Sequence, residues 1–185
     1  MKARPTKHAG EIILEVKPGD ELLLAPERAQ PAPTLKIRQM LVPIDFSECS
    51  KKGLRYAIAL AREHKAAITL AYVVPSISML GEYGGIDYAS LTKEMRESAD
   101  RELATVAVDE IRGVVPSDTV VRTGSPAGEI VSMAKTLPAD LIVISTHGRT
   151  GLKHALMGSV AERVVQTATC PVLVVREKER EILPD

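Results

Sequence analysis

The 185-residue chain is poor in aromatic side chains, which make up 3% of it and include no tryptophan. Proteins that hold single-stranded nucleic acid or RNA stack bases on aromatic rings, so this scarcity argues against that class of function. There is also no excess of basic residues, because 24 Lys and Arg balance 24 Asp and Glu. A protein that neutralises duplex DNA phosphates normally shows such an excess. The composition therefore predicts no nucleic-acid partner.

Cysteines are few, and Cys49 and Cys170 lie far apart in the sequence. Their separation matches neither the spacing of a metal site nor that of a redox pair. No apolar run approaches the roughly 20 residues that cross a bilayer. Residues 1–10 are basic but lack the apolar stretch of a secretory signal. We expect a cytoplasmic protein without a membrane partner and without a metal held by its own side chains.

The start of the chain differs from the rest. Glu11–Val16 and Glu21–Leu24 are short apolar segments that flank the turn signal Lys17–Asp20, a pattern that predicts a β-hairpin. Pro26–Pro33 contains three prolines and is typical of a linker. The sequence therefore predicts three parts: an N-terminal extension at 1–36, a main domain at 37–178 and a C-terminal tail at 179–185.

Within the main domain, strand and helix patterns alternate. Apolar runs predict strands at Met40–Ile44, Ala67–Val74, Thr119–Arg122, Asp140–Ser145 and Pro171–Val175. Apolar residues at helical spacing predict helices at Lys51–His64 and Leu91–Gly113, after the capping pair Ser125-Pro126, and at Ser159–Thr167. Strands that are apolar on both faces and alternate with amphipathic helices indicate a doubly wound, parallel α/β sheet with helices on both faces.

In such a sheet, ligands bind beyond the carboxyl ends of the strands, where the winding direction reverses. The first loop there is Pro43–Ser47, and it contains Asp45. A carboxylate at this place commonly meets a ribose hydroxyl or a metal. Asp45 could equally help to cap the next helix, with Ser47 as the direct N-cap. From this segment alone, both interpretations stand.

The loop after the fourth strand, residues 145–159, is long, glycine-containing and positively charged. Gly158 and Ser159 stand directly before a helix, where free amides and the helix dipole favour phosphate. A surface loop with a serine cap is the alternative, but the length, charge and location of the loop favour the anion site. By contrast, Gly124 and its neighbours after the third strand predict a turn and a cap and nothing more.

Four segments together resemble the universal stress protein family: Leu41–Ser47, Ser145–Gly151, Gly158–Val164 and Cys170–Val175. The resemblance covers about Met40–Arg176. It implies five parallel strands in the order 3-2-1-4-5 with two helices on each face. ATP-binding members carry Gly, two residues, Gly, nine residues, Gly and then Ser or Thr. Gly148, Gly158 and Ser159 match that signature here, whereas Ser145 replaces its first glycine.

The resemblance also implies a ligand arrangement. Pro43 and Asp45 would face adenine and ribose, Val73 would line the adenine pocket, and Gly124 would lie beside the nucleotide. The phosphates would lie over the signature residues and the amides that precede Val160, with Arg149 adding positive charge. His147 could touch phosphate or be a plain surface histidine. A divalent Mg²⁺ or Mn²⁺ on the phosphates and a homodimer through the last strand are implied as well.

Three functions follow for comparison. The first is an ATP-binding, dimeric regulatory or stress-response protein with an unidentified protein partner. The second is a member of the same family that works without nucleotide, through dimerisation and partner contacts, as Ser145 would favour. The third is a slow ATPase. The chain has no Gly-x4-Gly-Lys-Ser/Thr loop and no evident base paired with a nucleophile, so we predict no catalytic residue.

Overall fold

The computed structural model describes residues 2–5, 12–15, 35–76, 88–146 and 158–178. It divides the chain into two units, Met1–Leu35 and Lys36–Asp185, which are described separately below.

In the first unit, β1 (Lys2–Pro5) pairs antiparallel with β2 (Ile12–Glu15). The predicted strand Glu11–Val16 therefore exists, but its partner precedes it in the chain. The other predicted strand, Glu21–Leu24, lies outside the described residues. Lys2–Pro5 escapes a pattern-based prediction because two of its four residues are basic and one is proline, so it shows no apolar alternation.

The second unit contains a five-stranded sheet in which every neighbouring pair is parallel. Its strands are β3 (Gln39–Pro43), β4 (Ala67–Pro75), β5 (Ser117–Gly124), β6 (Leu141–Ser145) and β7 (Val172–Val175). They lie in the order β5-β4-β3-β6-β7, which confirms the predicted order 3-2-1-4-5.

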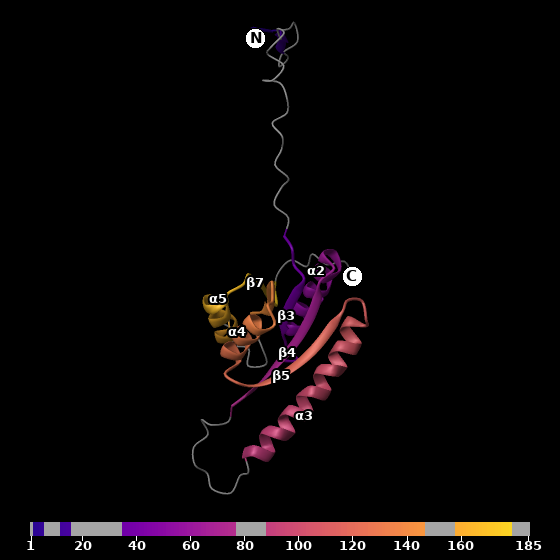
Figure 1. Ribbon diagram of the computed structural model, residues 1–185, viewed down its shortest axis with the longest axis vertical. Coiled ribbons are helices and arrows are strands. Elements are labelled where there is room, and N and C mark those ends of the chain that lie inside the picture. Colours follow the sequence, from indigo (N-terminus) through magenta and orange to yellow (C-terminus); the bar gives the residue numbers. More distant parts are fainter. Residues whose placement is uncertain (1, 6–11, 16–34, 77–87, 147–157, 179–185) are drawn as a thin grey trace. The chain divides into compact units, whose positions relative to one another are not determined.

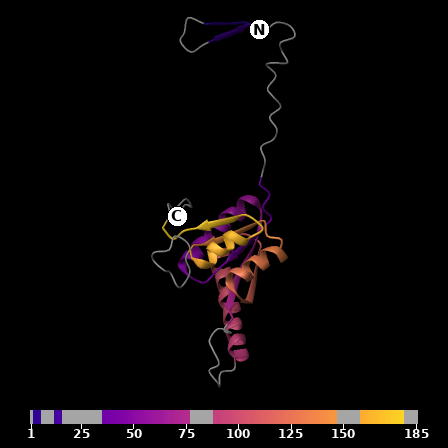
Figure 2. The same ribbon diagram turned by 90° about the vertical axis from the view of Figure 1, so that its left-hand side faces the viewer.

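Helices cover both faces of this sheet (Figure 1). They are α2 (Glu48–His64), α3 (Tyr88–Val106) with its π-helical continuation η1 (Ala107–Ile111), α4 (Pro126–Thr136) and α5 (Ser159–Thr167). Figure 2 looks onto the face covered by α4 and α5. Alternation along β3 serves both layers: Met40 and Val42 pack with α2 and α3, whereas Leu41 packs with α4 and α5. No helix in the described part of the chain is long and apolar enough to cross a membrane.

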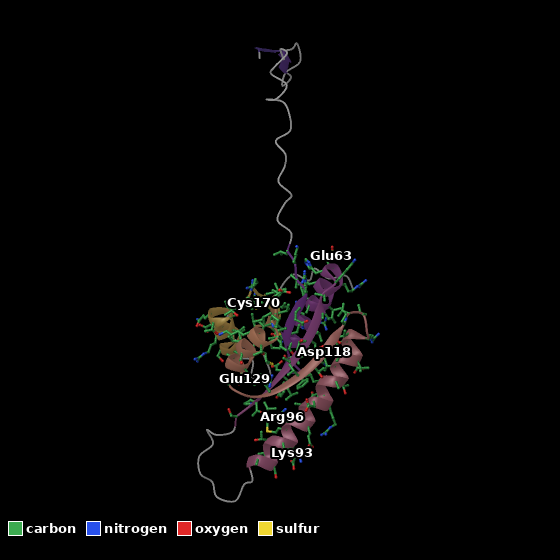
Figure 3. The ribbon with its side chains drawn as sticks, viewed as in Figure 1. Glu63, Lys93, Arg96, Asp118, Glu129 and Cys170 are labelled. Carbon is green, nitrogen blue, oxygen red and sulfur yellow. The ribbon has the colours of Figure 1, made fainter. Side chains whose placement is uncertain are left out.

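The starts of α2 and α4 differ, although serine occupies the N-cap of each. The Ser47 Oγ accepts a hydrogen bond from the Ser50 amide at 3.2 Å, which confirms Ser47 as the N-cap of α2. At α4, Pro126 occupies the first turn as predicted, but the Ser125 side chain makes no capping hydrogen bond. Pro126 has no N–H to offer. Glu129, in the first turn of α4, is labelled in Figure 3. Its side chain lies close to Gly124, where a Cβ would be 2.8 Å from the Glu129 Oε1.

The centre of the sheet opens at its carboxyl end. β3 and β6 are paired at Met40–Leu141 and Leu41–Ile142 only. Beyond this point β3 stays paired with β4 up to Pro43, and β6 stays paired with β7 up to Ser145. Because the two central strands separate here, the reversal point of the winding becomes a crevice.

Candidate functional site

A cavity of about 340 Å³ lies where β3 and β6 separate. Its volume is within the range of small-molecule sites. All strands of the sheet's centre and the starts of the flanking helices contribute to its wall. The lining residues are Pro43, Ile44, Asp45, Ser50, Ala71, Tyr72, Val73, Pro75, Pro126, Ile130, Ile144, Ser145, Thr146, Gly158, Ser159, Val160 and Ala161.

Asp45 follows the carboxyl end of β3, and the start of α2 holds its side chain in place. Its Oδ1 accepts hydrogen bonds from the Ser47 amide at 3.2 Å and the Ser47 hydroxyl at 2.6 Å. The Asp45 amide in turn donates to the Ser50 Oγ at 3.4 Å. The two interpretations of Asp45 are therefore compatible in space, because this carboxylate supports the N-cap and also lines the cavity.

The start of α5 faces the same cavity. Gly158 is its N-cap, and the first bond within the helix runs from the Glu162 amide to the Gly158 carbonyl at 2.9 Å. The amides of Ser159, Val160 and Ala161 therefore have no acceptor one turn back in the helix. Three such N–H groups, with the positive end of the helix dipole, favour an anion at this wall of the cavity.

The end of β6 is tied to that helix start through the backbone. The Thr146 amide donates to the Val175 carbonyl at 2.9 Å, and the Thr146 carbonyl accepts from the Gly158 amide at 2.6 Å. A Cβ on residue 158 would lie 2.6 Å from the same carbonyl oxygen. Gly158 is therefore required by its contact with Thr146, whereas its backbone angles, φ −70° and ψ 149°, suit any residue.

Most of the predicted site residues come together here. The cavity is lined by Pro43, Asp45, Val73, Ser145, Gly158, Ser159 and Val160. Gly124 is not among the lining residues; its φ of 157° and its contact with the Glu129 side chain account for the glycine locally. His147, Gly148 and Arg149 lie outside the described residues.

The sequence reasoning missed other lining residues. Ser50 was recognisable, because it stands three positions after the N-cap serine, on the first turn of the helix. Thr146 lies inside the signature, at one of the two positions after Ser145 for which the family pattern specifies no residue type. Tyr72 and Pro126 join the cavity through tertiary packing, for which the sequence carries no local signal. In the described ranges, no group of three or more His, Cys, Asp or Glu residues is placed to hold a metal ion.

The sheet order and the crevice at its reversal define an α/β protein of the doubly wound class. A sequence model of the universal stress protein family matches residues 36–176. The chain belongs to that family.

Individual relatives agree. Universal stress protein MJ0531 of Methanocaldococcus jannaschii is 35% identical over 144 residues, which are 78% of this chain and 85% of that protein. Universal stress protein YxiE of Bacillus subtilis is 33% identical over 145 residues, 75% of this chain and 98% of that one. The solved structure of MJ0577, also from M. jannaschii, has a TM-score of 0.69 at 28% identity and covers 79% of this chain and 100% of its own.

Proposed function

We propose that this universal stress protein binds ATP in the cavity between β3 and β6 and acts as a regulatory protein. One observation carries the proposal. A carboxylate, Asp45, and the start of α5, which has no side-chain cap, line one cavity whose remaining wall is largely apolar. A ligand that has a flat apolar ring, hydroxyl groups and an anionic end fits this distribution, and a nucleotide combines all three.

In the proposed arrangement, adenine lies against Val73 and Pro43 and the ribose hydroxyls donate to Asp45. The phosphates lie at the amides of Ser159 and Val160. Gly148, His147 and Arg149 would act on the phosphates from the preceding loop, and Gly124 would lie next to the nucleotide. A Mg²⁺ or Mn²⁺ ion would be held by the phosphate oxygens, as divalent metals commonly are at triphosphates.

The second candidate, a member that works without nucleotide, is favoured by Ser145 in place of the first signature glycine. Ser145 has no positive φ, so a serine costs no backbone strain there. Ser145 lines the cavity, and the cavity has a volume of about 340 Å³ with serine at this position. We therefore expect the Ser145→Gly variant to bind ATP as tightly as the wild type or more tightly.

We further propose a homodimer through β7. The two edges of the sheet differ in character. β5 carries Asp118 and Arg122 in exposed positions, and charges at an edge discourage pairing. β7 consists of Val and Leu alone and none of its four residues is fully exposed. An apolar edge strand favours pairing with another chain.

We also propose that the protein is cytoplasmic. Cys49 and Cys170 are both free thiols, as a reducing compartment keeps them.

The nucleotide content of freshly purified protein separates the three candidate functions. One sample is denatured, and its supernatant is analysed for nucleotides. A second, native sample is incubated with Mg²⁺ and ATP. Bound ATP that persists without turnover supports the proposal. ADP that forms at a steady slow rate identifies the slow ATPase. Protein that is free of nucleotide and takes none up belongs to the non-nucleotide class.

A further inference from the structure

Phe46 has a backbone conformation that its residue type disfavours. Its φ is +65°, in the left-handed region, which residues with a bulky side chain seldom enter. In the described part of the chain, Lys65 and Arg112 are the other non-glycine residues with positive φ, and both stand at helix C-caps, where this conformation is usual. Phe46 lies instead in the loop between β3 and α2, so helix termination does not explain it.

An aromatic contact accompanies this conformation. The Phe46 ring lies 4.8 Å from the Tyr72 ring, centroid to centroid, at an interplanar angle of 33°. Both rings pack against the core that α2 and α3 share with the sheet. Aromatic pairs at such a separation are stabilising, so the tilted pair can compensate for the cost of the left-handed backbone.

The conformation of Phe46 decides how its two neighbours meet. The Asp45 carboxylate and the Ser47 side chain come from opposite sides of this residue, yet they lie 2.6 Å apart at their oxygens. The Ser47 amide points at the same carboxylate oxygen at 3.2 Å. The backbone angles of residue 46 set the direction from which the Ser47 amide and hydroxyl approach the Asp45 carboxylate, so a change to another backbone region would move both donors. The orientation of Asp45 at the cavity therefore depends on the Phe46 backbone.

We propose that Phe46 is a positioning residue that sets the preference of the site for ribose over deoxyribose. By holding the left-handed turn, it aims the Asp45 carboxylate at the sugar hydroxyls. This inference rests on the proposed ATP site and assigns that site a source of sugar selectivity. A merely structural role for Phe46, as one more core residue, would affect stability but not the choice between sugars.

The test compares three variants by calorimetric titration with Mg-ATP, Mg-2′-deoxy-ATP and Mg-3′-deoxy-ATP. Phe46→Tyr keeps the ring. Phe46→Leu loses the ring and, like phenylalanine, disfavours the left-handed region, so nothing holds the turn in this variant. Phe46→Asn loses the ring but tolerates the left-handed region. We expect the wild type and Phe46→Tyr to prefer ATP over at least one deoxy form by about tenfold, the effect of one hydrogen bond to a charged group.

We expect the preference to fall to about twofold or less in Phe46→Leu and to survive in Phe46→Asn, whose residue type holds the turn by itself. Urea unfolding of each variant shows how far stability changes separately from selectivity. A full preference in a folded Phe46→Leu variant would overturn the positioning role. Loss of the preference for ATP in both the Phe46→Leu and the Phe46→Asn variants would also overturn it, because the sugar selectivity would then depend on the ring and not on the turn. A wild type that binds ATP and both deoxy forms equally refutes this inference alone, whereas a wild type that binds none of them refutes the ATP site as well.

Discussion

At the residue scale, Gly158 shows why a motif position can have more than one physical cause. The sequence pattern suggests that a glycine stands before α5 so that phosphate can approach the backbone. The structure adds a cause within the protein, because the carbonyl oxygen of Thr146 occupies the space that a Cβ would need. A glycine at this position therefore keeps the end of β6 and the start of α5 in contact, with or without a ligand.

We predict that Gly158→Ala destabilises the fold. The added Cβ would lie 2.6 Å from a backbone oxygen that cannot move alone, so the strand end and the helix start must separate. Overpacking of this kind costs about 1–3 kcal/mol of unfolding free energy. Urea denaturation followed by circular dichroism measures it.

Gly128→Ala is the matched control. A Cβ on Gly128 meets its nearest neighbour, the Ser125 Cβ, at 3.7 Å, which is ordinary contact. Since alanine favours the helix over glycine, we expect this variant to be more stable by about 0.5–1 kcal/mol. If both substitutions shift the urea midpoint in the same direction, the steric explanation for Gly158 is wrong.

At the scale of elements, α2 and α4 show that a serine can occupy the N-cap position of a helix with or without making the capping hydrogen bond. Ser47 and Ser125 both precede a helix and both have extended backbone angles, but the Ser47 hydroxyl alone accepts a capping hydrogen bond. We predict that Ser47→Ala lowers the free energy of unfolding by about 1 kcal/mol, a typical loss for an N-cap. Thermal or urea unfolding of the two alanine variants measures the difference.

Ser125→Ala should cost less than about 0.5 kcal/mol, because a substitution away from a specific contact usually changes little. A loss at Ser125 as large as that at Ser47 would mean that the Ser125 side chain caps α4 in solution, contrary to the structure.

These helix starts also show which features of the structure the sequence can predict. The capping residues and the apolar periodicity are local signals, so the positions of the helices and the parallel α/β class could be predicted from the pattern, whereas the order of the strands followed from the family resemblance. Whether a hydroxyl reaches an amide depends on side-chain contacts that no local pattern contains. The same holds for Tyr72 and Pro126 in the cavity wall. β1 could not be predicted either, because Lys2–Pro5 has no apolar periodicity and forms a strand by pairing with β2.

At the scale of the whole molecule, the outer edge of β7 is the surface that we expect to join two copies. Pro171 and Val175 direct their carbonyl groups toward β6, where they accept from the Ile142 and Thr146 amides. Because backbone groups alternate along a strand, those of Val172 and Val174 point to the outer edge. A dimer through this edge would use these outward groups.

Val174→Pro therefore removes one outward N–H and leaves the ladder to β6 in place, a position at which edge strands tolerate proline. We expect the wild type to be a dimer and this variant to be a monomer by multi-angle light scattering. Thr119→Pro makes the same change at the exposed edge of β5, whose Pro116 and Gly124 carbonyls face β4, and should leave the dimer intact. A dimer that survives Val174→Pro with unchanged stability does not use the β7 edge.

The most direct test of the proposed ATP site is calorimetric titration of folded, nucleotide-free protein with Mg-ATP, beside the Ser159→Asp variant. An aspartate in the first turn of α5 suits the helix dipole, so the fold should not be weakened. The same charge would repel phosphates at the neighbouring amides, and we expect the affinity to fall about tenfold or more. Ser132→Asp adds an equal charge to an exposed position of α4 away from the cavity lining and should bind like the wild type. Binding by the wild type with this pattern is the predicted result. No heat from the wild type, or equal affinity of the wild type and Ser159→Asp, would contradict a phosphate site at the start of α5.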